Sequence, residues 1–233
     1  MALPNVTVDA ASYPSLGLYT WSHTIGNHNN RMLIVGVSTH DTSDIVNVTL
    51  DWVPLTRLGN SQGISRGVTI WYMMNPPIGA GTIIVFSAVA NKKVCGAISL
   101  YNVDQTSPFR ATAENGATGA TYTLDISTNV NDLILAVGCG WHESTDYEMI
   151  PDVAMASRWN YVDSKPQGWG GTLSASANTT TISGNMANSS EWRLYLMSIQ
   201  PHRDYFSNKV NGIRYSGKIC GLAHTKIGKV NAV

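Results

Sequence analysis

Two unbroken apolar runs constrain the fold of this chain more than any other feature of its sequence. One run lies in residues 30–40 (NRMLIVGVSTH) and the other in residues 131–141 (NDLILAVGCGW). Both runs are short, carry β-branched side chains, end in polar residues and are broken by glycine, which favours a strand over a helix. We therefore expect them to form two central strands of an all-β core.

The rest of the chain predicts about a dozen strands in all and no convincing amphipathic helix. Alternation of apolar and polar residues marks expected strands at residues 5–9, 18–25, 45–50, 122–127 and 191–199. Further strands are expected at residues 67–74, 82–87, 94–101, 159–162, 172–177 and 179–183. Residues 111–120 are small and glycine-rich, which predicts a surface connection. The sequence thus predicts an all-β fold, with a β-sandwich or jelly roll in residues 1–202 and a short extended arm in residues 203–233.

Charge is sparse and balanced overall but uneven along the chain. Charged residues make up 13% of the sequence, with 15 basic and 15 acidic residues. This balance does not indicate nucleic acid or an anionic membrane as a partner. Residues 1–204 contain ten basic and fifteen acidic residues, whereas the segment after Asp204 contains five basic residues and no acidic one. The body therefore carries a net charge of −5 and the tail a net charge of +5.

Cysteine usage and hydropathy indicate synthesis in a reducing cytosol. The sequence contains three cysteines, of which Cys95 and Cys139 lie inside apolar runs. An odd number of such residues favours free thiols over a disulfide framework. Neither a signal-peptide pattern nor an apolar run long enough for a membrane span is visible, so no membrane association is expected.

The C-terminal segment repeats one five-residue theme: lysine, a β-branched residue, two small or polar residues, and an aliphatic residue. The copies begin at Lys209, Lys218 and Lys229. A segment this short cannot build a core of its own. Its apolar residues should therefore be covered by the body, by a symmetry mate or by another protein. A flexible basic tail is the alternative, but regular aliphatic spacing is unusual in disordered tails. The residues of the predicted assembly arm are Lys209, Val210, Asn211, Gly212, Ile213, Lys218, Ile219, Gly221, Leu222, Lys229, Val230 and Val233.

Several motifs of the body resemble a β-sandwich domain that recurs in bacterial and tailed-phage proteins. They are residues 21–24 (WSHT), 30–38 (NRMLIVGVS), 53–56 (VPLT), 71–79 (WYMMNPPIG) and 103–109 (VDQTSPF). The tail resembles short repeats at the ends of phage virion and tail-associated proteins. The resemblance implies a non-enzymatic structural virion protein of a tailed bacteriophage, such as a capsid decoration (cement) protein or a fibre or baseplate subunit. Such a protein is made in the host cytoplasm, binds other virion proteins and forms a homo-oligomer, for example a trimer.

One polar cluster invites a catalytic or metal-binding interpretation. His142, Glu143 and Asp146 follow the second apolar run, where loops often carry function. No second group of ligands with the spacing of a metal site completes the cluster, and no Gly-x-Ser-x-Gly motif provides a serine nucleophile. We therefore expect neither an enzyme nor a cofactor.

The seven tryptophans suggest carbohydrate binding as an alternative function, because aromatic faces stack on sugars. Trp52, Trp71, Trp141 and Trp192 lie in apolar strand contexts and are expected in the core. Trp159 and Trp169, the latter between glycines in residues 167–171 (QGWGG), lie in polar contexts that predict exposed loops. These two residues are the predicted contacts for a host glycan.

Overall fold

The computed structural model describes residues 5–15, 17–40, 45–88, 92–141, 149–151, 154–162, 166–203, 209–210 and 213–214. The chain divides into two compact units, Met1–His202 and Arg203–Val233. The predicted all-β class is confirmed, since every regular element in the described ranges is a strand. In the same ranges there is no helix that could cross a membrane.

The strands of the first unit, in chain order, are β1 (Thr7–Ser12), β2 (Thr20–Ile25), β3 (Met32–His40), β4 (Ile45–Leu50), β5 (Val53–Pro54), β6 (Thr56–Gln62), β7 (Arg66–Met74), β8 (Gly79–Ser87), β9 (Lys93–Tyr101), β10 (Phe109–Ser127), β11 (Leu133–Trp141), β12 (Met149–Pro151), β13 (Ala156–Val162), β14 (Pro166–Ser174) and β15 (Thr179–Ile199). The second unit contains β16 (Lys209–Val210) and β17 (Ile213–Arg214).

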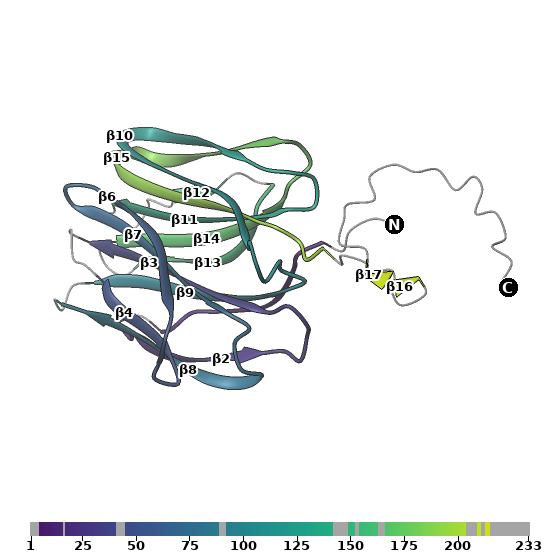
Figure 1. Ribbon diagram of the computed structural model, residues 1–233. Helices are drawn as coiled ribbons and strands as arrows, with labels where there is room; N and C mark the ends of the chain where they lie inside the picture. The colour runs from purple at the N-terminus through teal and green to yellow at the C-terminus, as the bar shows by residue number, and fades with distance from the viewer. Residues whose placement is uncertain are drawn as a thin grey trace, which may run out of the picture. The chain divides into compact units, whose positions relative to one another are not determined.

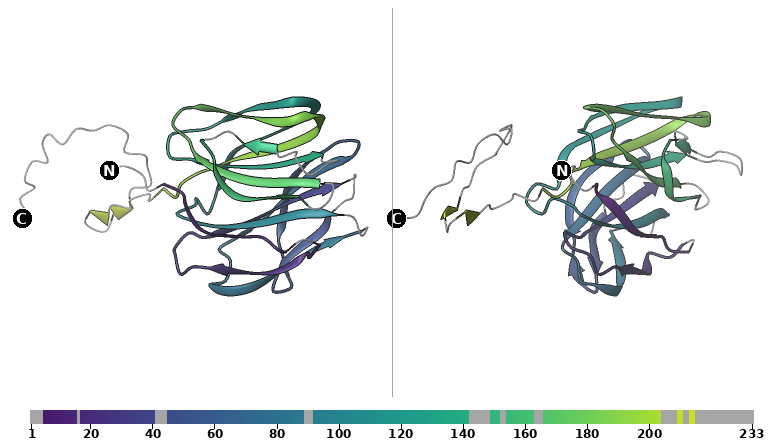
Figure 2. Two further views of the ribbon diagram at one scale, coloured as in Figure 1. Left: turned by 180° about the vertical axis from the view of Figure 1, so that it is seen from behind. Right: turned by 90° about the vertical axis from the view of Figure 1, so that its right-hand side faces the viewer.

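The first unit is a stack of antiparallel layers (Figure 1). The first outer sheet has the strand order β2-β8-β4-β5, and the first inner sheet has the order β1-β9-β3-β7-β6. The second inner sheet has the order β10-β15-β11-β14-β13, and β12 pairs with β15 beyond it. Seen from behind and from the side, the same order of layers runs through the body (Figure 2).

A long two-stranded ribbon of β10 and β15 replaces the surface connection predicted for residues 111–120, so that prediction is wrong. Gly119 pairs with Ser190, but the next pair is Thr121 with Asn185. Several residues of β15 are therefore left unpaired opposite a single residue of β10, and such a bulge bends a ribbon. Small residues are no obstacle here, because backbone hydrogen bonds hold the two strands together. Beyond the bend, the ribbon and β12 form a second outer layer.

The body is a structural repeat of two similar sandwiches. The first half consists of strands β1–β9, and the second half consists of strands β10–β15. The first inner sheet (β1-β9-β3-β7-β6) and the second (β10-β15-β11-β14-β13) have corresponding strands in the same order. In the first half, Met32 of β3 pairs with Leu100 of β9. In the second half, Leu133 of β11 pairs with Ile199 of β15. The outer layers correspond as well, since β4 pairs with β8 as β12 pairs with the distal part of β15.

Shared irregularities confirm that the two halves are equivalent in register. A bulge between β6 and β7 leaves Leu58 without a partner, and the bulge between β13 and β14 leaves Arg158 without one. The pairing of β1 with β9 skips Asp9, and the pairing of β10 with β15 skips Arg110. Bulges re-aim side chains at fixed positions, so these residues form two equivalent pairs.

Three apolar cores hold the layers together. One core lies inside each half, between its inner and outer layers. The third core lies between the two inner sheets and is called the joining core; it includes Ile34, Ile98, Leu135, Val137 and Trp159. The apolar run of β3 serves two cores, because Ile34 faces the joining core while Leu33 and Val35 face the core of the first half. Both predicted central strands are therefore buried on both faces.

The two halves meet as the subunits of a twofold dimer do. β3 packs on β14 as β11 packs on β7, and β13 packs on β1 as β10 packs on β6. This reciprocity defines an isologous contact. The predicted sandwich is thus confirmed, with the added finding that two sandwiches share one joining core.

Candidate functional site

The prediction that Trp159 and Trp169 are exposed in loops is wrong. Trp159 lies on β13 in the joining core and is 2% exposed, and Trp169 lies on β14 in the core of the second half and is 0% exposed. The neighbouring glycines explain the burial, because a Cβ atom at Gly96 or Gly170 would lie within 2.2 Å of the Trp159 indole. These glycines make room for a buried ring, so neither indole can stack on a sugar.

The remaining tryptophans follow the prediction in part. Trp71 and Trp192 are buried, as expected. Trp52 was expected in the core but is 75% exposed, at the turn between β4 and β5. The turn puts Asp51 and Trp52 at φ values of 49° and 69°, in the left-handed region. Among the tryptophan side chains that the structure describes, which do not include that of Trp141, Trp52 is therefore the exposed one.

The predicted assembly arm is described at its first repeat. β16 pairs with β17, with Lys209 opposite Arg214 and Val210 opposite Ile213. The other predicted residues of the arm lie outside the described residues, namely Asn211, Gly212, Lys218, Ile219, Gly221, Leu222, Lys229, Val230 and Val233. The cluster of His142, Glu143 and Asp146 also lies outside them.

A groove of about 660 Å³ opens between the two halves, beside edge strand β1 and facing β13 and β14. Its wall on the first half consists of Val6 and the residues Thr7–Ala11 of β1. Its wall on the second half consists of Leu133, Ala154, Ala156, Arg158, Thr172, Leu173 and Ser174. A volume of this size is typical of ligand pockets.

Arg158 is the cation of the groove. Its Nε donates a hydrogen bond to Oγ1 of Thr172 at 2.9 Å, which fixes the guanidinium and leaves its terminal nitrogens available. Burial lowers the pKa of Arg158. None of the ion pairs within the described ranges involves this side chain. A partly desolvated arginine without an acidic partner favours binding of an anion.

Asp9 also lines the groove, but its carboxylate is already bound. It accepts hydrogen bonds from the Gly26 backbone N–H at 2.7 Å and from Oγ of Ser99 at 2.9 Å. His28 lies 3.4 Å from its other oxygen. The carboxylate thus stabilises the bulge of β1 and the turn after β2.

The equivalent space on the opposite side of the joining core is filled. Register assigns Leu58 to the position of Arg158, Tyr72 to that of Thr172, and Met74 to that of Ser174. All three of these large side chains pack against the joining core, as does Phe109, the equivalent of Val8. The rings of Tyr72 and Phe109 meet edge to face at 5.1 Å. The groove therefore exists where smaller or polar residues replace the apolar residues that close its counterpart.

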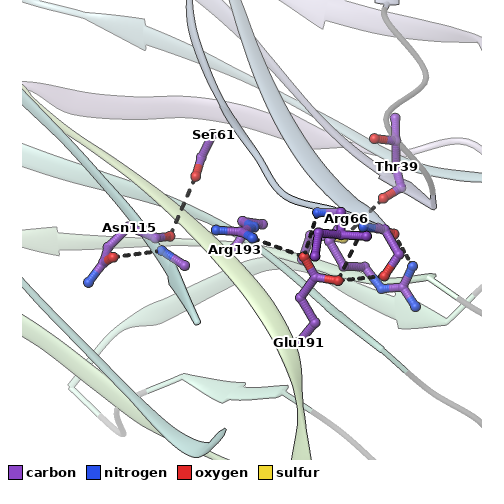
Figure 3. Close-up of polar contacts among 10 residues, drawn as sticks. Thr39, Ser61, Arg66, Asn115, Glu191 and Arg193 are labelled. Atoms are coloured by element: carbon purple, nitrogen blue, oxygen red, sulfur yellow. Dashed lines mark hydrogen bonds and ion pairs between the residues drawn. The ribbon is translucent and has the colours of Figure 1, made fainter. Parts of the chain in front are cut away.

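A polar cluster closes the same opposite side (Figure 3). Glu191 accepts hydrogen bonds from the Ile64 backbone N–H at 3.1 Å and from Arg193 at 2.9 Å, and it also binds Ser65. Burial raises the pKa of Glu191, but the hydrogen bonds from Ser65 and Arg193 outweigh it and leave the pKa lowered. Ser61 donates to the backbone oxygen of Asn115 at 3.5 Å, joining β6 to β10. These contacts tie the two halves together.

Sequence reasoning missed the groove. Val8 and Arg158 line one wall each, although they are far apart in the chain. The sequence signal that was available is a single arginine in the otherwise uncharged segment 154–162. This arginine points to a groove only once Arg158 is known to occupy the position equivalent to Leu58 in the first half.

No protein-family model, curated protein or solved structure matches this chain. The resemblance of its motifs to phage β-sandwich proteins remains a prediction.

Proposed function

We propose that this protein is a non-enzymatic structural protein of a tailed-phage virion, a capsid decoration (cement) or fibre or tail-associated subunit. It docks on other virion proteins through residues 203–233 and works as a homo-oligomer. The observation that carries the proposal is the coincidence of charge with structural division. Residues 1–202 contain nine basic and fourteen acidic residues, whereas residues 203–233 contain six basic and one acidic residue.

The arm has the chemistry for docking by strand pairing. Its described part is a small hairpin in which Val210 stands opposite Ile213, and two-stranded hairpins are marginally stable by themselves. Contact with a partner surface would satisfy the outer backbone edges of this strand pair. Lysines at the start of each repeat favour an acidic partner surface, which also accelerates association.

Removal of the arm tests this proposal. A chain ending at His202 should keep the far-ultraviolet circular dichroism and thermal transition of a folded β protein, but should no longer enter assembled particles. Two full-length variants separate the contributions of charge and apolar contact. One replaces Lys209, Lys218 and Lys229 with glutamine, and the other replaces Val210, Ile219 and Val230 with serine. Incorporation of the shortened chain at the level of the full chain would contradict the proposal.

Carbohydrate binding is a second candidate function, and the exposure of Trp52 favours it. The indole lies beside Phe86, with ring centroids 6.3 Å apart, at the edge of the first outer sheet. Hydroxyl-bearing residues of the same sheet, Thr20, Ser22 and Thr82, are exposed nearby on β2 and β8. Exposed aromatic rings combined with hydroxyl groups suit sugar rings.

A glycan array tests this candidate. Binding that is lost in Trp52→Ala but kept in Ile64→Ala would support it, since Ile64 is 92% exposed and not aromatic. Absence of binding by the wild-type chain, or equal binding by both variants, would rule the candidate out.

A further inference from the structure

We propose that the groove beside β1 binds an extended peptide that carries a carboxylate side chain. The peptide pairs with the free edge of β1, and its carboxylate pairs with Arg158. This site belongs to residues 1–202 and does not depend on the C-terminal arm.

Among the described strands, none pairs with the outer edge of β1. β1 is the terminal strand of the first inner sheet and pairs with β9 alone among the described strands. The consecutive residues Val6–Ala11 all line the groove, so the groove follows the strand for about 20 Å at roughly 3.3 Å per residue. A strand edge presents a row of backbone N–H and C=O groups that a second extended chain can satisfy.

A pair of stacked aromatic rings and an apolar lining border the groove. The rings of Tyr13 and Tyr161 stack at 5.5 Å, with an interplanar angle of 29°, just beyond the β1 end of the groove. Leu133, Leu173 and Ala156 provide an apolar lining. A peptide lying along β1 would therefore place alternate side chains against an apolar surface, as strand addition requires.

Arg158 supplies the specificity. Its Nε is held by Thr172, and its terminal N–H groups are the donors that a carboxylate can accept in a bidentate geometry. The hydroxyl of Ser174 lies in the same lining and adds a further donor. Asp9 also lines the groove, but its carboxylate accepts hydrogen bonds from Gly26 and Ser99, and none of the ion pairs among the described residues joins it to Arg158.

Comparison of the two halves shows that the groove is not a general consequence of the fold. The equivalent position of Arg158 holds Leu58, which packs against the joining core. Replacing a core-facing leucine with a partly buried arginine costs stability unless the charge finds a partner. A carboxylate ligand would supply such a partner.

A blocked heptapeptide of alternating threonine and valine with a central glutamate tests the proposal on the full-length chain. Its affinity is measured by isothermal titration calorimetry, against the same peptide with glutamine in the centre. We expect the glutamate peptide to bind at least about tenfold more tightly, the effect of one charge-assisted hydrogen bond. Hydrogen exchange should show new protection at the β1 amides that face the groove.

Two variants introduce into the groove the side chains found at the equivalent positions of the first half, Leu58 and Met74. Arg158→Leu should abolish the preference for glutamate, and Ser174→Met should weaken binding of both peptides by filling the groove. Ser174→Met also keeps the test decisive if Arg158→Leu fails to fold. The matched control is Lys92→Leu, which removes an exposed basic residue outside the groove and should leave both affinities unchanged.

Several results would overturn the proposal. Equal binding of the two peptides would show that no carboxylate is recognised. Free glutamate binding as tightly as the peptide would assign the site to a small carboxylate instead of a strand. A solution mass by light scattering that falls from dimer to monomer in Ser174→Met would mean that a second copy of this chain fills the groove.

Discussion

Gly96→Ala is the substitution whose effect the structure defines most sharply. A Cβ atom at this position would lie 2.1 Å from Cδ2 of Trp159 and 2.4 Å from its Cε2. These atoms belong to the fused edge of the indole, which has no flexible end that can turn aside. The ring has little room to shift sideways, because it also lies close to the backbones of Gly170 and Gly36, where an added Cβ atom would be 2.2 Å and 3.1 Å from it. The new methyl group must therefore force the two inner sheets apart locally.

The expected cost follows from two opposing effects. Overpacking a well-packed core costs about 1 to 3 kcal/mol, and the confined ring places this site near the upper value. Replacement of glycine by alanine lowers the entropy of the unfolded chain, which returns about 0.4 to 1 kcal/mol. We expect the free energy of unfolding to fall by about 2 kcal/mol.

Urea denaturation followed by tryptophan fluorescence measures this loss. Gly119→Ala is the matched control, since the nearest atom to its Cβ would be 3.6 Å away, and its stability should stay within about 0.5 kcal/mol of wild type. Trp159→Leu in the Gly96→Ala background should cost less than Trp159→Leu alone, because the smaller side chain removes the clash. Equal stability of the two alanine variants, or strict additivity in the double variant, would refute the packing argument.

Three further predictions follow from buried polar groups. Burial lowers the pKa of His23 to about 4. The unfolded state therefore takes up a proton first as the pH falls below 6.5, and the free energy of unfolding should drop by about 2 kcal/mol between pH 7.5 and 5. Urea titrations of His23→Gln at both pH values should show a smaller drop, and a drop equal to that of wild type would contradict the assignment. Asp132 is fully buried and bound to Arg110 at 2.5 Å, so Asp132→Asn should lower stability by about 3 kcal/mol, whereas Asp125→Asn at an exposed site should change the melting temperature little. Burial raises the pKa of the Cys139 thiol to about 12. Mass spectrometry should therefore find this residue unmodified by iodoacetamide until the protein is denatured. Modification of the native protein would contradict this expectation and show that the joining core opens.

The pattern of apolar residues along the chain was sufficient to predict the strands, because this pattern depends only on consecutive residues. The runs at residues 30–40 and 131–141 are continuously apolar in their middle parts, and the structure buries these parts on both faces in strands β3 and β11. Alternate residues of a strand point to opposite sides, so Leu33 and Ile34 were bound to enter different cores. The all-β class therefore followed from the sequence alone.

The structural repeat was hidden from the sequence because cores select for volume and apolarity more than for identity. A few equivalent positions keep the same residue, such as Asn30 and Asn131, which both adopt positive φ, and the buried Ser99 and Ser198. Most do not. Gly96 stands at the position equivalent to Tyr195 in the register of the two inner sheets. Only the shared strand order revealed that these residues are counterparts.

Trp159 and Arg158 are adjacent in the chain, yet tertiary structure gave them opposite roles. Glycines from three separate strands make the space that buries Trp159, so its burial depends on backbone that no local pattern could place beside it. Arg158 stands at a bulge whose counterpart holds Leu58, and that difference opens a groove against β1. The sequence alone determined the strands and their two-sided burial, which are local properties. The packing of the two halves decided which side chains are enclosed and which face a ligand, because those contacts join residues far apart in the chain.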